Sequence, residues 1–320
     1  MRVLASAFER AASGYTARMS TLPTIGFIGL GIMGRPMCGH LLAAGYPLRV
    51  HTRTPATARA LCDQGAIWRD TPAALAADCD FVLLNVPDTT DARSVLFGAN
   101  GAAATLRPGT IVIDHSTINP QATRRFARRL ARQRVHLLDA PVTGGERGAQ
   151  DATLTILVGG ARKAFERARP VLERLGRKIV YVGRSGAGQE TKACNQILVA
   201  VNMMGVCEAL AFAQRCGLDL THVIETLAEG AGGSWAWTHL GAKIARDDLL
   251  PAFMIQLMQK DLRIVQETAA QHTTPLPAVA LAQQMFRTVE DLPDGARLGT
   301  QALALAYPAL RARSRHATAR

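Results

Sequence analysis

Residues 29–34 read Gly29-Leu30-Gly31-Ile32-Met33-Gly34, and this stretch decides the fold. The apolar run 24–28 precedes it, and a helix-compatible stretch, 35–44, follows and stops at Gly45. A strand, a glycine turn and a helix in this order form the dinucleotide-binding fingerprint. The same letters can form an ordinary turn, but the flanking strand and helix favour a cofactor site.

Each glycine of the fingerprint has a physical role. Gly29 allows the tight turn, Gly31 lets the backbone approach a pyrophosphate, and Gly34 lets the helix pack on the strand. Free amides at the start of the helix hold the anion. We therefore assign five residues to the cofactor site: Gly29, Gly31, Ile32, Met33 and Gly34.

The end of the next strand, 47–51, selects the cofactor. An NAD site usually has an acid about 20 residues after the fingerprint, whereas an arginine suits the 2′-phosphate of NADP. Here the strand is followed by Thr52-Arg53-Thr54, and the first acid after the fingerprint is Asp63. We therefore expect no carboxylate near Arg53. Because Arg53 offers a planar fork and Thr54 a hydroxyl, we expect NADP(H) to be preferred, with NAD as the alternative. Arg53 as a solvated strand-end arginine is the competing interpretation.

Strand-like and helix-like segments alternate through the first half of the chain. The expected strands are 81–86, 110–113, 135–138, 154–158 and 179–182, and the expected helices between them include 72–77 and 121–132. Such alternation indicates an α/β fold with a doubly wound, mainly parallel sheet. After Gly188 helical periodicity runs over 190–216, and no convincing strand follows. An all-helical domain, entered by a long interdomain helix, is therefore expected.

Length supports two domains, because 320 residues with 48% hydrophobic content can bury two cores. We predict an N-terminal extension, disordered or misassigned, over 1–23, a dinucleotide-binding domain over 24–185, a helical substrate and oligomerisation domain over 186–312, and a basic tail over 313–320.

The net charge of +12 raises a nucleic-acid interpretation. The basic residues are mostly scattered arginines, apart from a group spaced at helical intervals: Arg124, Arg125, Arg128, Arg129 and Arg132. A solvated face of an amphipathic helix explains that spacing, and aromatic residues, which stack on bases, make up only 5% of the chain. We expect no nucleic-acid partner.

The expected location is the cytoplasm. The six cysteines form no C-x-x-C pair and no spacing typical of a metal site, so we expect buried free thiols and no metal. No apolar run reaches a membrane span, because Asn202 and Glu208 interrupt the best one, 197–213. The arginines of residues 1–18 imitate a transit peptide, but Met19 favours an upstream-assigned start or a disordered tail.

The start of the long helix carries the best catalytic candidate, Lys192. Lys192, Asn195 and Gln196 stand at i, i+3 and i+4, and their shared face continues as apolar residues. A lysine on an apolar stripe lacks water, so its pKa falls and it becomes a proton donor or acceptor near neutrality. A lysine that snorkels to solvent at a helix start is the alternative.

Two further segments follow predicted strands, where open α/β sheets place ligands. In Asp139-Ala-Pro-Val-Thr143-Gly144-Gly145, a hydroxyl and consecutive glycine amides can bind a small carboxylate. The second segment is Asp114-His115-Ser116-Thr117. Both strengthen the catalytic interpretation of Lys192.

Four ordered motifs resemble those of the β-hydroxyacid dehydrogenase family, which includes 3-hydroxyisobutyrate dehydrogenases and tartronate semialdehyde reductases. Besides the fingerprint they are Asp114-x-Ser-Thr, Asp139-x-Pro-Val-Thr-Gly-Gly, Gly186-x-Gly-x-x-x-Lys192 and Lys260-Asp-Leu. The resemblance covers about residues 24–310. It implies a Rossmann domain, a helical domain like that of 6-phosphogluconate dehydrogenases, and a homodimer or homotetramer.

The resemblance also implies an activity and roles for the site residues. The family interconverts a short 3-hydroxy acid and its semialdehyde by hydride transfer. Lys192 would protonate the carbonyl oxygen, Asn195 and Gln196 would orient the substrate, and Thr143, Gly144 and Gly145 would hold its carboxylate. The cofactor would also contact Val86, Pro87, Ser116, Thr117 and Lys260.

The chain departs from the family pattern in two places. Thr143 stands where serine is usual, which adds a methyl group to the pocket, and Gln196 stands where many members have a second asparagine. The pair Asn195-Gln196 is similar to the tartronate semialdehyde reductase branch, but two residues do not settle a substrate. Trp235 and Trp237 line the pocket or pack in the helical core.

Two other functions compete with that of a hydroxyacid dehydrogenase. An imine reductase on a similar fold would be expected to carry Asp or Tyr in place of Lys192. A catalytically silent NADP-binding module would not need all four motifs. His51, His115 and His136 suit surface or strand-end positions, lack the partner spacing of a triad, and receive no role.

Overall fold

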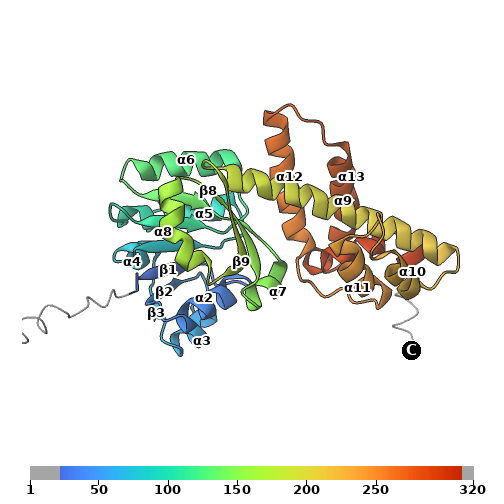
Figure 1. The fold of residues 1–320 in the computed structure, drawn as a ribbon, viewed down its shortest axis with the longest axis horizontal. Helices are drawn as coiled ribbons and strands as arrows, with labels where there is room; N and C mark the ends of the chain where they lie inside the picture. Colours follow the sequence, from blue (N-terminus) through green and yellow to red (C-terminus); the bar gives the residue numbers. More distant parts are fainter. Residues whose placement is uncertain (1–21, 312–320) are drawn as a thin grey trace, which may run out of the picture.

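A computed structural model describes residues 22–311 of the chain. Its first half is built on one nine-stranded sheet in the order β3-β2-β1-β4-β5-β6-β8-β7, with β9 paired to β8 (Figure 1). The strands are β1 (Ile25–Ile28), β2 (Leu48–His51), β3 (Ile67–Trp68), β4 (Phe81–Leu84), β5 (Ile111–Asp114), β6 (His136–Asp139), β7 (Val142–Thr143), β8 (Leu154–Gly159) and β9 (Gly176–Gly183).

Helices cover both faces of this sheet, as a doubly wound fold requires. They are α2 (Gly34–Ala43), α3 (Arg59–Cys62), α4 (Pro72–Ala76), α5 (Thr89–Phe97), α6 (Pro120–Ala131), α7 (Gly145–Gln150) and α8 (Arg162–Leu172), with the short turns η1 (Pro55–Ala58) and η2 (Ala102–Ala104). Because both faces are covered, every residue of β1, β4 and β5 is buried.

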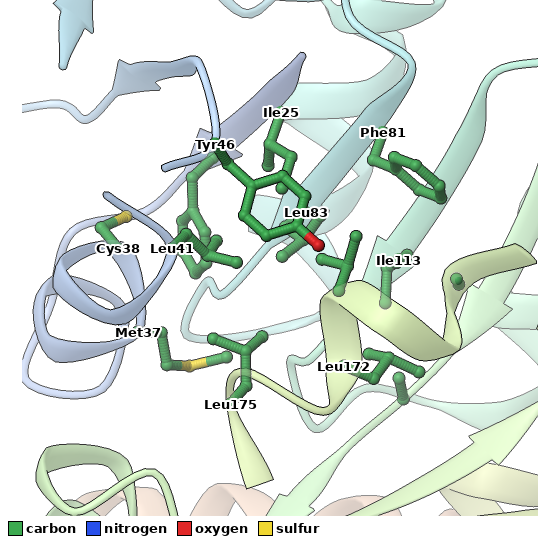
Figure 2. Packing of buried hydrophobic residues seen from close by; sticks show 14 of the residues in the cluster. Ile25, Met37, Cys38, Leu41, Tyr46, Phe81, Leu83, Ile113, Leu172 and Leu175 are labelled. Carbon is green, nitrogen blue, oxygen red and sulfur yellow. The ribbon is translucent and has the colours of Figure 1, made fainter. Parts of the chain in front are cut away.

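Alternate residues of each strand contribute to different cores. On one face, Met37 and Leu41 of α2 and Leu175 after α8 meet Ile25 and Leu83 of the sheet (Figure 2). On the other face, residues such as Val82 and Val112 pack against α4, α5 and α6. The carboxyl ends of β1, β4 and β5 therefore reach one edge together, where the predicted site residues follow.

The expectation of a mainly parallel sheet is confirmed from β3 through β6. The direction changes beyond β6, because β8 runs antiparallel to β6 and β7, and β9 runs parallel to β8. The chain reaches β8 through β7 and the short helix α7, without the long crossover that a parallel neighbour would need.

The second half is helical, as expected. It contains α9 (Ala187–Arg215), α10 (Leu220–Leu227), the π-helical turn η3 (Ala236–Gly241), α11 (Ala242–Ala245), α12 (Ile255–Gln271), α13 (Pro277–Glu290), η4 (Gly295–Arg297) and η5 (Thr300–Ala306). Its core includes Met203, Leu210, Leu262 and Phe286. Helix α9 runs from the sheet into this helical part (Figure 1).

Some expectations from composition need correction. Within 22–311, α9 is the helix that is long and apolar enough to cross a membrane by length and composition alone, so Asn202 and Glu208 do not disqualify it. The buried stripe of α9 packs against α12, α13 and the sheet, and a core helix passes the same test. All six cysteines are free, but Cys194 and Cys216 are exposed rather than buried.

The arginines of α6 do form a solvent-facing side, as expected. Arg125, Arg128 and Arg129 are exposed, while Phe126 and Leu130 are buried on the opposite side. The predicted extension over 1–23 and the predicted tail over 313–320 lie largely or wholly outside the described residues.

Candidate active site

The glycine turn has the geometry that a dinucleotide requires. Gly29 adopts a φ of +100°, and a side chain there would collide with the backbone of Asn85. A side chain at Gly34 would collide with the carbonyl of Gly29, so α2 could not approach β1 as closely. A side chain at Gly31 would meet nothing within 4 Å, which leaves its backbone open to a ligand. Ile32 is exposed beside it.

Arg53 lies just beyond β2, and a carboxylate contacts its guanidinium group. Its Nη1 is 3.4 Å from Oδ1 of Asp91, in the first turn of α5. The sequence interpretation that no carboxylate stands near Arg53 is therefore wrong. Asp91 was missed because it is 38 residues away in the chain, after a different strand. Thr54 is exposed beside Arg53.

The ends of β4 and β5 are joined by a serine. The Oγ of Ser116 accepts the amide hydrogen of Val86 at 2.9 Å, and the amide of Ser116 donates to Oδ1 of Asp114 at 2.9 Å. Burial raises the pKa of Asp114 to about 6. The loops that contain Val86, Pro87, Ser116 and Thr117 are thus fixed to each other at the predicted cofactor edge.

Gln189, a buried residue of α9, holds the second loop from the helical side. Its Nε2 donates to the carbonyl of Ser116 at 2.8 Å, and its Oε1 accepts the amide hydrogen of Ile118 at 3.1 Å. Both bonds grip the backbone on either side of Thr117. Sequence reasoning missed Gln189; the only signal was its position three residues before Lys192, on the same helix face.

Asp139, at the end of β6, anchors the start of α9. Its two carboxylate oxygens accept the amide hydrogens of Gly186 at 2.8 Å and Gln189 at 3.1 Å. An acid at this position satisfies free helix amides and complements the helix dipole. Burial raises the pKa of Asp139. A side chain at Gly188 would enter this contact, so the glycine is needed.

The predicted carboxylate segment follows Asp139 directly. Thr143 is half-buried in β7, paired with Thr155 of β8, and Gly144 and Gly145 adopt φ values of +127° and +62°. Consecutive amides in such conformations form a concave donor group. Among residues 22–311 no hydrogen bond or ion pair joins this segment to Lys192, so its role as a carboxylate site remains a prediction.

Lys192 is buried, with only 8% of its surface exposed. Within the described part of the chain its ammonium group has no hydrogen bond and no carboxylate within 4.0 Å. Burial lowers the pKa of Lys192 to about 8; Asp261 opposes this change and Lys260 adds to it. A lysine that snorkels to solvent would be exposed. The burial of Lys192 therefore favours the first interpretation, a lysine with a lowered pKa.

A buried network connects α9 to α12. The Nδ2 of Asn195 donates to Oε1 of Gln196 at 2.7 Å, and Nε2 of Gln196 donates to Oδ2 of Asp261 at 2.6 Å. Lys260 Nζ lies 2.7 Å from Oδ1 of Asp261, without hydrogen-bond geometry, and donates to the carbonyl of Thr117 at 2.7 Å. The structure thus brings Asn195, Gln196, Lys260 and Thr117 together.

A second polar contact crosses between the two halves. Arg263 of α12 bonds Oδ2 of Asp88 at 2.6 Å and Oε1 of Glu267 at 2.8 Å. Glu267 in turn accepts a hydrogen bond from Asn119 at 3.1 Å. Asp88 and Asn119 cap the first turns of α5 and α6, so α12 contacts both loops of the predicted cofactor edge.

The tryptophan and histidine candidates differ in burial: some are in the core and others are exposed. Trp237 belongs to the helical core, where its Nε1 donates to the carbonyl of Ile224 at 3.0 Å. Trp235 is exposed and stacks on His239. His115 lies at a strand end, as expected, but it is buried rather than exposed. Its Nδ1 is 2.8 Å from the carbonyl oxygen of Ala140, and desolvation lowers the pKa of His115 to about 4. His51 follows expectation at a half-buried strand end, and His136 is exposed.

Both halves of the chain match domains of known proteins. Residues 24–183 match the NAD binding domain of 6-phosphogluconate dehydrogenase, and residues 186–306 match a domain described as NAD-binding of NADP-dependent 3-hydroxyisobutyrate dehydrogenase. The 2-hydroxy-3-oxopropionate reductase of Escherichia coli is 41% identical over 264 residues, which cover 82% of this chain and 90% of that protein.

Solved structures show the same fold. The 3-hydroxyisobutyrate dehydrogenase of Mycobacterium tuberculosis, with L-serine, is 32% identical with a TM-score of 0.81, covering 88% of this chain and 98% of that one. An imine reductase of Myxococcus stipitatus, at 19% identity and a TM-score of 0.61, covers 89% of this chain and 99% of its own and shares the fold alone. The chain belongs to the β-hydroxyacid dehydrogenase family, whose members are NAD(P)-dependent oxidoreductases that act on CH–OH groups.

Proposed function

We propose that this enzyme interconverts a short 3-hydroxy acid and its semialdehyde with NADP(H), and that Lys192 is its general acid and base. The observation that carries the proposal is the buried Lys192, which shares one helix face with Asn195 and Gln196. The network through Asp261 and Lys260 ties that face to the loop of Thr117.

The residues divide the work as follows. A bound nicotinamide supplies or accepts the hydride. Lys192 Nζ donates a proton to the carbonyl oxygen during reduction and takes it back during oxidation. Asn195 and Gln196 orient the substrate, and Thr143, Gly144 and Gly145 bind its carboxylate and hold the reacting carbon in line. Val86, Pro87, Ser116, Thr117 and Lys260 form the cofactor side of the site.

NADP(H) is the proposed cofactor because Arg53, at the end of β2, is 79% exposed and has one long contact, to Asp91, so its guanidinium can form a fork around a phosphate. The proposed location is the cytoplasm, and the proposed assembly is a homodimer or homotetramer. The substrate class is supported by the names of relatives, a 2-hydroxy-3-oxopropionate reductase and a 3-hydroxyisobutyrate dehydrogenase with L-serine. Lys192 disfavours an imine reductase, and a silent module would not turn over any aldehyde.

The test is a substrate panel followed by the absorbance of NADPH. Glyoxylate, tartronate semialdehyde, methylmalonate semialdehyde and succinic semialdehyde are compared with propanal, which lacks the acid group. Because an anchored carboxylate is used to orient the carbonyl, propanal should be reduced at least ~100-fold less efficiently than the best acid. Thr143→Val should reduce that difference by weakening only the acids. Comparable rates for propanal and the acids would refute the carboxylate site, and no turnover with any of them would refute the proposed substrate class.

A further inference from the structure

We infer that Asp91 is a specificity-determining residue of the cofactor site, which accepts the adenosine ribose 2′-hydroxyl and opposes a phosphate there. The inference rests on the proposed NADP(H) site at Arg53 and adds a second residue of opposite charge to it. Together the two residues would let the enzyme use both nicotinamide cofactors, with Arg53 favouring NADP(H) and Asp91 favouring NAD(H).

The geometry places Asp91 where the strand-end acid of an NAD site would act. Its Oδ1 lies 3.4 Å from the guanidinium of Arg53, so a group bound by Arg53 is within reach of Asp91 as well. Arg53 lies in the loop after β2 and Asp91 in helix α5, which follows β4; these two strands flank β1 and its glycine turn on either side. The acid that the sequence lacks after β2 is thus supplied by α5.

Of the two acids at the start of α5, only Asp91 is free for this task. Asp88 is occupied, because its carboxylate accepts the amide hydrogen of Thr89 at 2.6 Å and pairs with Arg263. Within residues 22–311 the side chain of Asp91 has one polar contact, the long one with Arg53, and it is 28% exposed. At 3.4 Å, near the limit for a hydrogen bond, that contact is easily exchanged for a ligand.

The charges act differently on the two cofactors. A ribose hydroxyl can donate to the Asp91 carboxylate while Arg53 keeps its ion pair. A 2′-phosphate takes the guanidinium, but its two negative charges then stand beside a carboxylate, which costs part of the gain. Because exposed charge pairs contribute up to about 1 kcal/mol, each effect amounts to about two- to fivefold in affinity.

The experiment measures calorimetric binding of two probes that need no substrate, 2′,5′-ADP and 5′-AMP, to the full chain. Asp91→Asn should bind 2′,5′-ADP more tightly and 5′-AMP more weakly, so that the ratio of the two affinities rises about tenfold. Turnover with NADPH and NADH should change in the same sense. The matched control is Asp63→Asn, which removes an equal charge from the exposed end of α3 and should leave the ratio unchanged.

Other outcomes identify what has failed. An unchanged ratio in Asp91→Asn, or equal tightening of both probes, overturns the inference. Arg53→Ala separates this from the proposed function, because it should weaken 2′,5′-ADP at least tenfold and 5′-AMP little. If Arg53→Ala weakens both probes equally, the NADP(H) proposal fails and the inference falls with it. If Arg53→Ala is selective and Asp91→Asn shifts nothing, only the inference fails.

Discussion

At the scale of single residues, burial turns Lys192 from a permanent cation into a group that titrates near neutrality. Loss of solvent lowers its pKa from 10.5 to about 8, even though Asp261 acts in the opposite direction. A general acid or base works best when its pKa lies near the working pH. Gln196 contributes here indirectly, since its hydrogen bond holds the Asp261 carboxylate, whose charge limits the fall in the pKa of Lys192.

The pH dependence of the reaction follows from this pKa. Reduction needs protonated Lys192, so its kcat/KM should fall as the pH rises through about 8, and oxidation needs the neutral amine, so it should rise through the same range. Lys192→Ala should lose ~100- to 10,000-fold in rate, still bind NADPH, and lack this pH-dependent step. Initial rates in both directions between pH 6 and 10, together with fluorescence titration of NADPH, check these outcomes.

Lys192→Arg is the control for charge. Its guanidinium stays protonated throughout the pH range, so the step near pH 8 should disappear although the charge remains. A variant at position 192 that keeps a third of native turnover, or that keeps the same pH step, would show that another group transfers the proton.

At the scale of helices and strands, the sequence predicted what local pattern determines. The glycine turn, the strands β4 and β5, and the 29-residue helix α9 all have periodicity or spacing that a reader can follow along the chain. The reversed direction of β8 could not be predicted, because a strand's apolar pattern is the same in either direction.

The missed site residues share a different cause. Gln189 bonds a loop 71 to 73 residues earlier in the chain, and Asp91 meets Arg53 across 38 residues. Such pairs depend on which strands are neighbours in the sheet, so single-sequence patterns carry no signal for them. His115 was expected at a surface or strand-end position; it does follow the end of β5, but its burial could not be predicted, since only the fold brings the carbonyl of Ala140 and the helix α9 against this strand end.

Gln189 joins α9 to the Thr117 loop, so its loss should affect both stability and catalysis. Gln189→Met keeps the length of the side chain but leaves a buried amide and a buried carbonyl unpaired, which should destabilise the protein by about 2–4 kcal/mol. Because Thr117 then moves relative to Lys192, kcat should fall about tenfold even at saturating cofactor and substrate. Urea unfolding and steady-state kinetics measure the two effects.

A second buried glutamine separates positioning from general destabilisation. Gln259 of α12 makes two hydrogen bonds to α13, with the carbonyl of Gln283 and with Glu290, away from the cofactor loops. Gln259→Met should lower stability by a smaller amount, because Oε1 of Gln259 is already buried without a partner and Glu290 also pairs with Arg287, and it should leave kcat unchanged. If both variants lose turnover in proportion to stability, Gln189 has no positioning role.

At the scale of the whole molecule, one side of α9 is exposed and largely apolar. The exposed apolar or small residues on this side are Cys194, Leu198, Gly205, Ala209 and Phe212, and the polar residues Asn202 and Glu208 are exposed between them. The side chains of Leu198 and Phe212 are 62% and 70% exposed, which is unusual for large apolar residues in a row. The stripe from 194 to 212 is about 27 Å long at 1.5 Å per residue, and its small central residues allow another helix to approach closely.

A second copy of the chain is the occupant that we propose for this stripe. Two α9 helices related by a twofold axis would bury the same apolar residues on both copies, as a closed symmetric interface requires. Phe212→Glu places a charge at one end of the stripe without touching the core, so the proposed dimer or tetramer should dissociate to smaller species at micromolar concentration. Light scattering coupled to size-exclusion chromatography measures the mass. The control is Ile67→Glu, which adds the same charge at an exposed position of β3 and should leave the mass unchanged. A native chain that is already monomeric would contradict an interface along α9. A Phe212→Glu variant with the native mass would contradict it as well.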